Sequence, residues 1–208
     1  MPKKKVKFNI KNAHYALLTR DEETGAISYG TPVAVTGSVS LSLDINGDQE
    51  DFYADGIAYY TDNTNRGYTG DWELAYIFEQ MRKEILQEIQ DNTDVMFEVQ
   101  ETGEPVEFAF GFQIDGNYNS TRFWFYDCTA ARPNMEANTT EGSNTPQTDT
   151  LSLTMRGAEV KTGDTKHYVR ARLDSDSTAG ATAYAAWFEA VVLPGTFAAA
   201  ATNTETNP

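Results

Sequence analysis

The chain has 208 residues, of which 40% are hydrophobic, so it can bury one good-sized core and we expect a single domain. Sixteen basic residues face 31 acidic ones, and the formal net charge of −15 disfavours a protein that wraps nucleic acid through Lys and Arg. No run approaches the roughly 18 apolar residues of a membrane span, and the first residues lack a signal-peptide core. The single cysteine, Cys128, excludes an internal disulfide. These features predict a protein made in a cytoplasm.

Alternation of apolar and polar residues with period two predicts strands over most of the chain. It is clearest in residues 37–44, where Val39, Leu41 and Leu43 alternate with serines. The same pattern returns in residues 68–76, 106–114 and 148–156 and, more weakly, in 166–173.

The run 106–114 ends at Asp115-Gly116, a dipeptide typical of a hairpin turn. The returning strand is expected over residues 121–130. Its aromatic run, Phe123-Trp-Phe-Tyr126, offers large side chains to both faces of a sheet. We therefore expect this strand to be covered on both sides.

Two segments break the strand rhythm with helical spacing. Apolar residues at Phe78, Met81, Ile85, Leu86 and Ile89 predict a helix of about three turns that packs over a sheet face. An Ala-rich second helix is expected from residue 182 to 192, with a terminal strand as the alternative.

Three stretches lack a core pattern. Residues 137–147 form a polar loop, and residues 198–208 form a tail of Ala, Asn and Thr that we expect to be disordered. The stretch 44–67 is expected to be a long irregular loop. It differs from the other two because aromatic side chains are embedded among acidic ones, which is typical of a surface that meets a partner.

Candidate chemistry is sparse. The two histidines, His14 and His167, lie in no metal-ligand spacing, and Cys128 sits in an aromatic strand, where a buried small side chain is far more common than a nucleophile. No glycine pattern of a phosphate-binding loop occurs. We therefore expect no catalytic residue, no metal and no cofactor, and not an enzyme.

Several phrases, taken in order, resemble the major tail protein, or tail tube protein, of long noncontractile-tailed bacteriophages (siphophages) of Gram-positive hosts. The resemblance spans residues 5–193. The phrases are Tyr29-Gly-Thr-Pro-Val33, Gly37-Ser-Val-Ser-Leu-Ser-Leu-Asp44, Phe52-Tyr-Ala-Asp-Gly56, Gly67-Tyr-Thr-Gly-Asp-Trp-Glu-Leu74, Tyr126-Asp-Cys-Thr-Ala-Ala-Arg-Pro133 and Trp187-Phe-Glu-Ala-Val191.

The resemblance implies a mainly β fold: an antiparallel β-sandwich with one flanking α-helix and a long protruding loop. Residues 1–197 would form this tail-tube domain, with a flexible N-terminal arm, and residues 198–208 the tail. Six copies would form a ring, and stacked rings would form the tail tube, a conduit for DNA delivery. Ring closure would use sheet edges that a monomer leaves open.

The resemblance also assigns roles to residues. The loop 44–67 would reach the neighbouring ring, and its contacts would come from Asp48, Glu50, Asp51, Phe52, Tyr53, Asp55, Tyr59 and Tyr60. Acidic side chains on polar strand faces, Asp71, Glu73 and Glu107, are candidates to line the lumen and to keep passing DNA from sticking. Arg156, Arg170 and Arg172 are expected to face away from it.

The implied partners are further copies of the chain, a tape measure protein, a tail terminator and distal tail or baseplate proteins, with genomic DNA passing through without specific binding. The implied location is the virion, after assembly in the host cytoplasm. Two alternatives stay open: another virion ring protein, such as a tail terminator or decoration protein, and a monomeric β-sandwich that binds a ligand.

Overall fold

The computed structural model describes residues 6–47, 49–54, 56–100, 103–116, 118–135, 137, 139, 146–161 and 163–197. In the strands at 49–54 and 57–63 it describes the backbone and, of the side chains, Ile57 alone. The polar loop expected at 137–147 lies almost wholly outside the described residues, and the expected tail at 198–208 lies wholly outside them.

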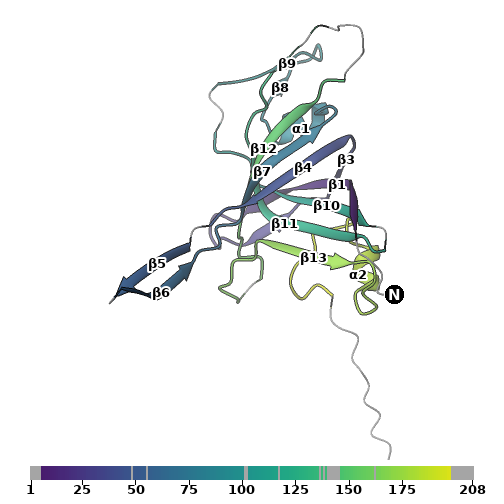
Figure 1. The fold of residues 1–208 in the computed structure, drawn as a ribbon. Coiled ribbons are helices and arrows are strands. Elements are labelled where there is room, and N and C mark those ends of the chain that lie inside the picture. The colour runs from purple at the N-terminus through teal and green to yellow at the C-terminus, as the bar shows by residue number, and fades with distance from the viewer. Residues whose placement is uncertain are drawn as a thin grey trace, which may run out of the picture.

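The fold is mainly antiparallel β and sandwich-like, which confirms the fold class expected from the sequence (Figure 1). Nine strands form one sheet in the order β2-β1-β10-β11-β12-β7-β4, with β3 also paired to β1 and β13 to β11. Their bounds are β1 Lys7–Arg20, β2 Ile27–Tyr29, β3 Val33–Val35, β4 Ser38–Ile45, β7 Tyr68–Leu74, β10 Phe108–Gly116, β11 Thr121–Ala130, β12 Asp149–Arg156 and β13 Arg170–Asp174.

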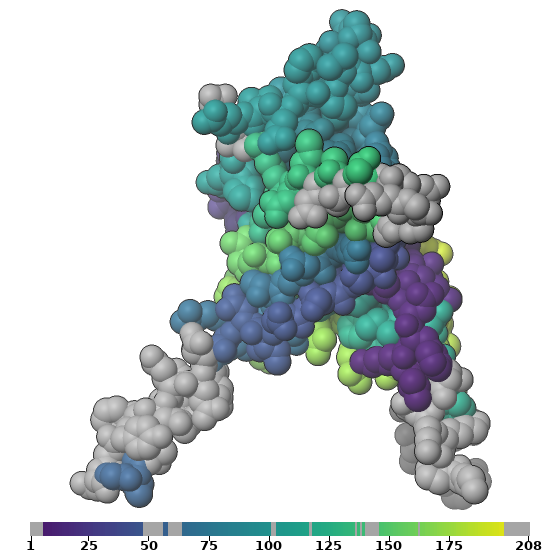
Figure 2. Space-filling view, turned by 45° about the horizontal axis from the view of Figure 1, so that its top comes forward, coloured from purple at the N-terminus to yellow at the C-terminus, as the bar shows by residue number. Residues whose placement is uncertain are grey.

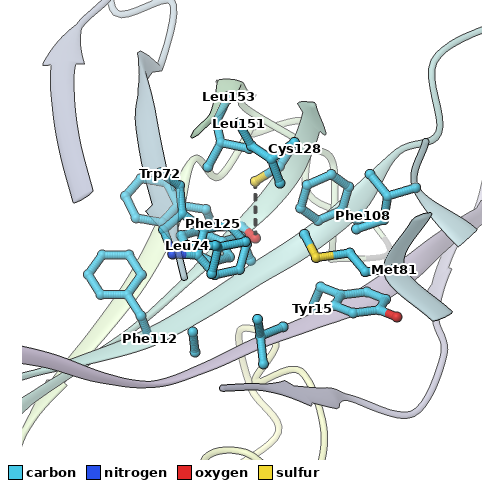
Figure 3. Close-up of a cluster of buried hydrophobic side chains, with 14 of the residues drawn as sticks. Tyr15, Trp72, Leu74, Met81, Phe108, Phe112, Phe125, Cys128, Leu151 and Leu153 are labelled. Atoms are coloured by element: carbon cyan, nitrogen blue, oxygen red, sulfur yellow. Dashed lines mark hydrogen bonds between the residues drawn. The ribbon is translucent and has the colours of Figure 1, made fainter. Parts of the chain in front are cut away.

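The sheet folds over so that β4, β7 and β12 face β1, β10 and β11 across one apolar core (Figure 3). Trp72 of β7 lies against Phe110 of β10, with ring centroids 4.6 Å apart. Leu151 and Leu153 of β12 complete the facing layer. In β12 these leucines alternate with polar residues, as the sequence predicted, so one side of the strand lies in this core and the other side faces outward.

The longest strand, β1, was not predicted from the sequence. A register shift between Lys11 and His14, where Asn12 adopts a positive φ of 51°, inserts a β-bulge into the strand. The bulge changes the phase of the alternation, so Ile10 and Tyr15 reach the same core although they differ in parity. Any N-terminal arm of the kind expected from the sequence therefore ends before Lys7.

The strand β11 is covered on both sides, as expected. Phe123 and Phe125 point into the main core, whereas Trp124 and Tyr126 point into a second apolar cluster on the opposite face. Residues 175–197 cover that second face. The hydrogen bonds that fix them to it include one of 2.8 Å from Trp124 Nε1 to the Trp187 carbonyl and one of 2.7 Å from the Tyr126 hydroxyl to the Val192 carbonyl.

The strands β10 and β11 form the predicted hairpin, but the predicted turn position was wrong. Asp115 and Gly116 still belong to β10, because both pair with the start of β1. A side chain at Gly116 would lie 2.5 Å from the Asn119 carbonyl oxygen, so glycine permits this close approach. The connection to β11 follows after Gly116.

The first helix, α1 (Glu79–Glu84), packs onto the main core through Met81, as expected, but it is shorter than three turns. It ends because Gln87 adopts a positive φ of 59° and the chain turns. Ile85 and Leu86 remain buried, whereas Ile89, expected on the buried face, is exposed.

The second helix, α2 (Ala181–Ala185), forms only the first part of the expected 182–192 helix, and no terminal strand forms there. In the described part of the chain, no helix has the length and apolarity to cross a membrane.

Two short hairpins stand outside the main sheet. One pairs β8 (Ile89–Gln90) with β9 (Met96–Phe97), and the other pairs β5 (Gln49–Ala54) with β6 (Ile57–Asn63). The expectation of an irregular loop over 44–67 was therefore wrong in its secondary structure. The β5–β6 hairpin does extend away from the main sheet (Figure 1).

Candidate assembly surfaces

The outward face of β4, β7 and β12 is polar along its whole length. Register places Ser42, Asp71 and Ser152 side by side in one row across the three strands. The next rows hold Ser40, Glu73 and Thr150, and then Asp44, Thr69 and Thr154. Because cross-strand neighbours share a face, hydroxyls and carboxylates alternate over this surface, which we call the polar face.

The carboxylates of the polar face are held by hydroxyl groups. Ser152 donates to Asp71 at 2.7 Å, and Ser40 and Thr148 each donate to Glu73 at 2.7 Å. The bonds from Thr148 and Ser40 lower the pKa of Glu73. The polar face is therefore negatively charged and well ordered at neutral pH.

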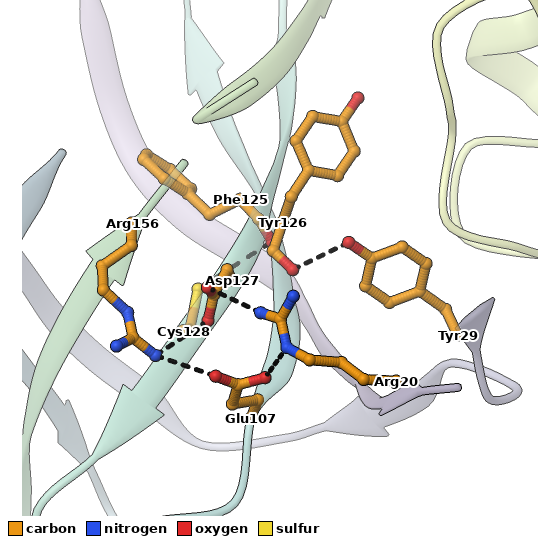
Figure 4. Close-up of polar contacts among 8 residues, drawn as sticks. All are labelled: Arg20, Tyr29, Glu107, Phe125, Tyr126, Asp127, Cys128 and Arg156. Carbon is orange, nitrogen blue, oxygen red and sulfur yellow. Dashed lines mark hydrogen bonds and ion pairs between the residues drawn. The ribbon is translucent and has the colours of Figure 1, made fainter. Parts of the chain in front are cut away.

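The third predicted acidic residue, Glu107, lies on the continuation of the same face, beyond β12. There it belongs to a ring of alternating charges with Arg20, Arg156 and Asp127 (Figure 4). The Glu107 carboxylate forms ion pairs with the guanidinium groups of Arg20, at 2.6 Å, and Arg156, at 3.0 Å. The Asp127 carboxylate forms ion pairs with the same two guanidinium groups, at 3.1 Å to Arg20 and 3.3 Å to Arg156.

Asp127 is almost fully buried, because a β-bulge in β11 places it there. Phe108 pairs with Cys128 and Phe110 with Phe125, so β11 holds one extra residue between these pairs. Burial and the nearby Glu107 carboxylate raise the pKa of Asp127, against the opposite effect of the two arginines. The ring joins β1, β11, β12 and Glu107, the residue just before β10, where β11 passes from β13 to β12.

This ring bears on two of the expectations from the sequence. Arg156 was expected to face away from the lumen and Glu107 to line it, but the two side chains are paired, so these two predictions cannot both hold. Asp71 and Glu73 have no such cationic partner among the ion pairs of the described residues. Arg170 does lie on the other side, over the rings of Tyr68 and Phe123.

Six of the eight residues predicted to contact a neighbouring ring belong to the strands of the β5–β6 hairpin. Asp48 and Asp55 lie outside the described residues. Glu50, Asp51, Phe52 and Tyr53 belong to β5, and Tyr59 and Tyr60 belong to β6, but only their backbone is described. The structure therefore brings these residues together on one projecting element, and their contacts stay a prediction.

Several strands of the main sheet have one side without a partner strand among the described residues: β2, β3 and β13 each pair with one strand, as do β4 and the start of β1. β4 pairs with β7 only, and the exposed side chains of Val39 and Ile45 lie on it. At the other end, residues 7–11 of β1 pair with β10 only, since β3 joins β1 from Ala13 onward. Unpaired strand edges are sites at which another chain can add.

The residues weighed for catalysis have structural surroundings. Cys128 is fully buried in the main core, as expected, and burial raises the pKa of its thiol. The His14 ring stacks on Phe188 with centroids 4.4 Å apart. Within the described ranges, no group of three His, Cys, Asp or Glu side chains could hold a metal ion.

Comparisons with known proteins give little similarity. No protein-family model matches the chain, and no curated protein matches it. Among solved structures, a chain in the 6-fold symmetrised cryo-EM structure of the anti-feeding prophage (AFP) baseplate matches with a TM-score of 0.43 and 12% sequence identity. The match covers 83% of this chain and 97% of that one.

Sequence reasoning missed the charge ring and the hairpin strands. The ring unites residues from three strands with Glu107, which precedes a fourth strand, and no local pattern could group them. The hairpin did carry a signal: Ala54 pairs with Ile57 across an Asp-Gly dipeptide, and Gly56 has a positive φ of 78°. Asp-Gly between two runs of strand-forming residues is typical of a two-residue hairpin turn.

Proposed function

We propose that this protein is a structural virion protein, and that copies of it assemble into stacked hexameric rings that form a phage tail tube. The proposal treats the chain as a non-enzymatic subunit without a cofactor. The observation that carries it is that the main sheet keeps open edges, among them β4 and residues 7–11 of β1, which a closed assembly would use. The ordered phrases that resemble tail tube proteins supply the particular assembly.

The polar face supports the assignment of the lumen. Asp71 and Glu73 project from it beside hydroxyl groups, and the ion pairs of the described residues leave both carboxylates without a cation. In a ring of six copies, such a face would line the bore with 12 carboxylates and repel DNA phosphates. Glu107 is the weaker lumen candidate, because Arg20 and Arg156 neutralise it.

Assembly of the purified protein tests the proposal. Negative-stain electron microscopy and sedimentation across a concentration series should show hollow tubes or stacked rings. Single rings that never stack would favour a tail terminator or another ring protein. A chain that stays monomeric, even with tail initiator proteins supplied, would leave the ligand-binding β-sandwich as the better explanation.

A charge reversal tests the lumen assignment separately. Asp71→Lys with Glu73→Lys changes the charge by four per copy and by 24 per ring of six. Tubes of this variant should retain double-stranded DNA at low salt and release it as salt rises, whereas wild-type tubes should not bind it. The matched control is Glu22→Lys with Glu23→Lys, which are exposed and lie outside the polar face, in the turn between β1 and β2. Equal DNA retention by both variants, or unaffected DNA ejection by phage that carries the first, would refute the assignment.

A further inference from the structure

The C-terminal segment, residues 175–197, covers the outer face of β11 without joining the main sheet as a strand. β13 ends at Asp174, and the described residues that follow form the short helix α2 and turns. The helix α2 lies close to β13 in Figure 1, whereas Figure 2, which looks onto β4 and the start of β1, shows little of this segment. Since the segment lies outside the ladder of the sheet, side-chain contacts decide how firmly it stays in place.

Three outward residues of β11 hold this segment in one row. Arg122 donates a hydrogen bond to the Tyr184 carbonyl, in addition to the bonds from Trp124 and Tyr126 described above. Residues two apart in a strand share a face, so the three donors lie side by side under the segment. The contact with β1 is of a different kind, because it is made by stacked rings.

The contact with β1 is a ring stack between Phe188 and His14. The two centroids are 4.4 Å apart, and the ring planes differ by 8°. The bulge at Asn12 fixes the imidazole, because His14 Nδ1 donates to the Asn12 carbonyl at 2.9 Å. A carbonyl oxygen only accepts, so neutral His14 carries its proton on Nδ1, and Nε2 is the atom that a second proton would bind.

The surroundings of His14 disfavour that second proton. The Arg122 guanidinium lies 5.1 Å from the centroid of the Phe188 ring, so this ring already faces one cation. A charged imidazolium stacked on the same ring would lie close to a like charge. Burial and, to a smaller extent, Arg122 lower the pKa of His14, against the opposite effect of the bond to Asn12.

The remaining neighbours of His14 are uncharged, paired or exposed. Its register partners, Gly111 of β10 and Ala34 of β3, carry no charge. The C-terminal segment contributes Glu189, which follows Phe188 and is exposed. On the paired strands β1 and β10, one ion pair is neutral as a whole, that of Lys11 and Asp115.

We propose that the stack of His14 on Phe188 is a pH-operated latch for the C-terminal segment. Neutral His14 keeps residues 175–197 docked, and its protonation loosens them and uncovers Trp124 and Tyr126 on the outer face of β11. The latch does not depend on the proposed assembly into a tube.

The direction of the pH dependence follows from the two states of His14. Its pKa is lowered in the docked state, whereas release of the segment returns it toward the ordinary histidine value of about 6.5. The stabilisation of the docked state is therefore complete above about pH 6.5 and is lost as pH falls through the docked value. Between these two values, each pH unit weakens docking by up to about tenfold.

Amide hydrogen exchange tests the latch at about pH 7.5 and about pH 5, with each rate corrected for the intrinsic pH dependence of exchange. Amides of residues 175–197 should lose about threefold or more of their protection at the lower pH, while amides of β7 and β12 keep theirs. No loss in residues 175–197 would overturn the proposal. An equal loss in β7 and β12 would do so too, because acid would then open the whole fold.

Variants identify the group that titrates. His14→Phe keeps an aromatic ring against Phe188 but cannot gain a proton, so protection of the C-terminal segment should no longer depend on pH. The matched control is His167→Gln, which removes the other histidine of the chain at an exposed position and should keep the wild-type response. Glu189→Gln should keep it as well. A response that survives in His14→Phe, or that disappears in either control, would overturn the proposal.

An NMR titration of the wild-type protein gives a readout that needs no variant. The imidazole of His14 should titrate below the ordinary histidine value of about 6.5, and the signals of Phe188 and Trp187 should shift with the same midpoint. A His14 midpoint at or above about 6.5 would contradict the latch, because docking would then favour the protonated ring.

Discussion

Replacing Trp187 with Ala should cost about 3–5 kcal/mol of unfolding free energy, the range for truncating a large buried aromatic side chain. Trp187 is 2% exposed and lies in the second apolar cluster, against the outer face of β11. Its Nε1 donates to the Phe123 carbonyl at 3.3 Å, a long bond that contributes only about 1 kcal/mol of the total. Since domains of this size are stable by about 5–15 kcal/mol, the change removes a large share of that stability.

The loss should be concentrated in residues 175–197, because the main core does not include Trp187. Urea unfolding followed by circular dichroism gives the magnitude, and amide hydrogen exchange gives the location, with protection lost first around α2. Trp187→Phe keeps most of the apolar contact and should cost about 1–2 kcal/mol. Tyr76→Ala, at an exposed aromatic residue, should cost less than about 0.5 kcal/mol. A loss below about 1 kcal/mol in Trp187→Ala would show that the C-terminal segment does not depend on this side chain.

Three further experiments test the packing around Gly111, the burial of Cys128 and the titration of Glu73. Gly111→Ala should destabilise the fold by about 1–3 kcal/mol in thermal or urea unfolding, because its Cβ would lie 2.8 Å from the Trp124 ring. The Cys128 thiol should react with a thiol reagent only at the rate of unfolding, and fast labelling of the native protein would contradict its burial. The Thr148 and Ser40 bonds lower the pKa of Glu73, so its stabilising contribution should be complete above the ordinary glutamate pKa of about 4.3 and disappear as pH falls through the folded value. Glu73→Gln should therefore be less stable than wild type at pH 7 and similar to it at strongly acidic pH, and a difference that grows on acidification would have the wrong sign.

Much of the fold follows from local sequence pattern. The bounds predicted for β4, β7, β10, β11 and β12 each lie within two residues of the observed ones at both ends of the strand. This was possible because each of these strands buries one face or both in an apolar core, and period-two burial leaves a direct record in the sequence. In β12, for example, polar and hydrophobic residues alternate without interruption from Thr150 to Arg156.

The errors have physical causes as well. β1 escaped prediction because a bulge at Asn12 shifts its phase, and the β5–β6 hairpin because it stands apart from the core and needs no alternation. The helix at residues 78–89 was overestimated because Ile85 and Leu86 continue its apolar spacing after the helix has ended. Ile85 and Leu86 are apolar because they are buried in the core, although they lie beyond the end of the helix.

For the candidate surfaces, the sequence by itself determined composition: an acidic chain, a lysine-rich start, an acidic aromatic segment, and strands with one polar side. Those properties depend on residue type and on neighbours along the chain. Only the tertiary structure decided which carboxylates keep their charge uncompensated, because Glu107 meets Arg20 and Arg156 from distant strands whereas Asp71 meets a serine. It also placed the start of β1 and the β5–β6 hairpin on opposite sides of the molecule, a relation set by strand order and not by any local pattern (Figure 1).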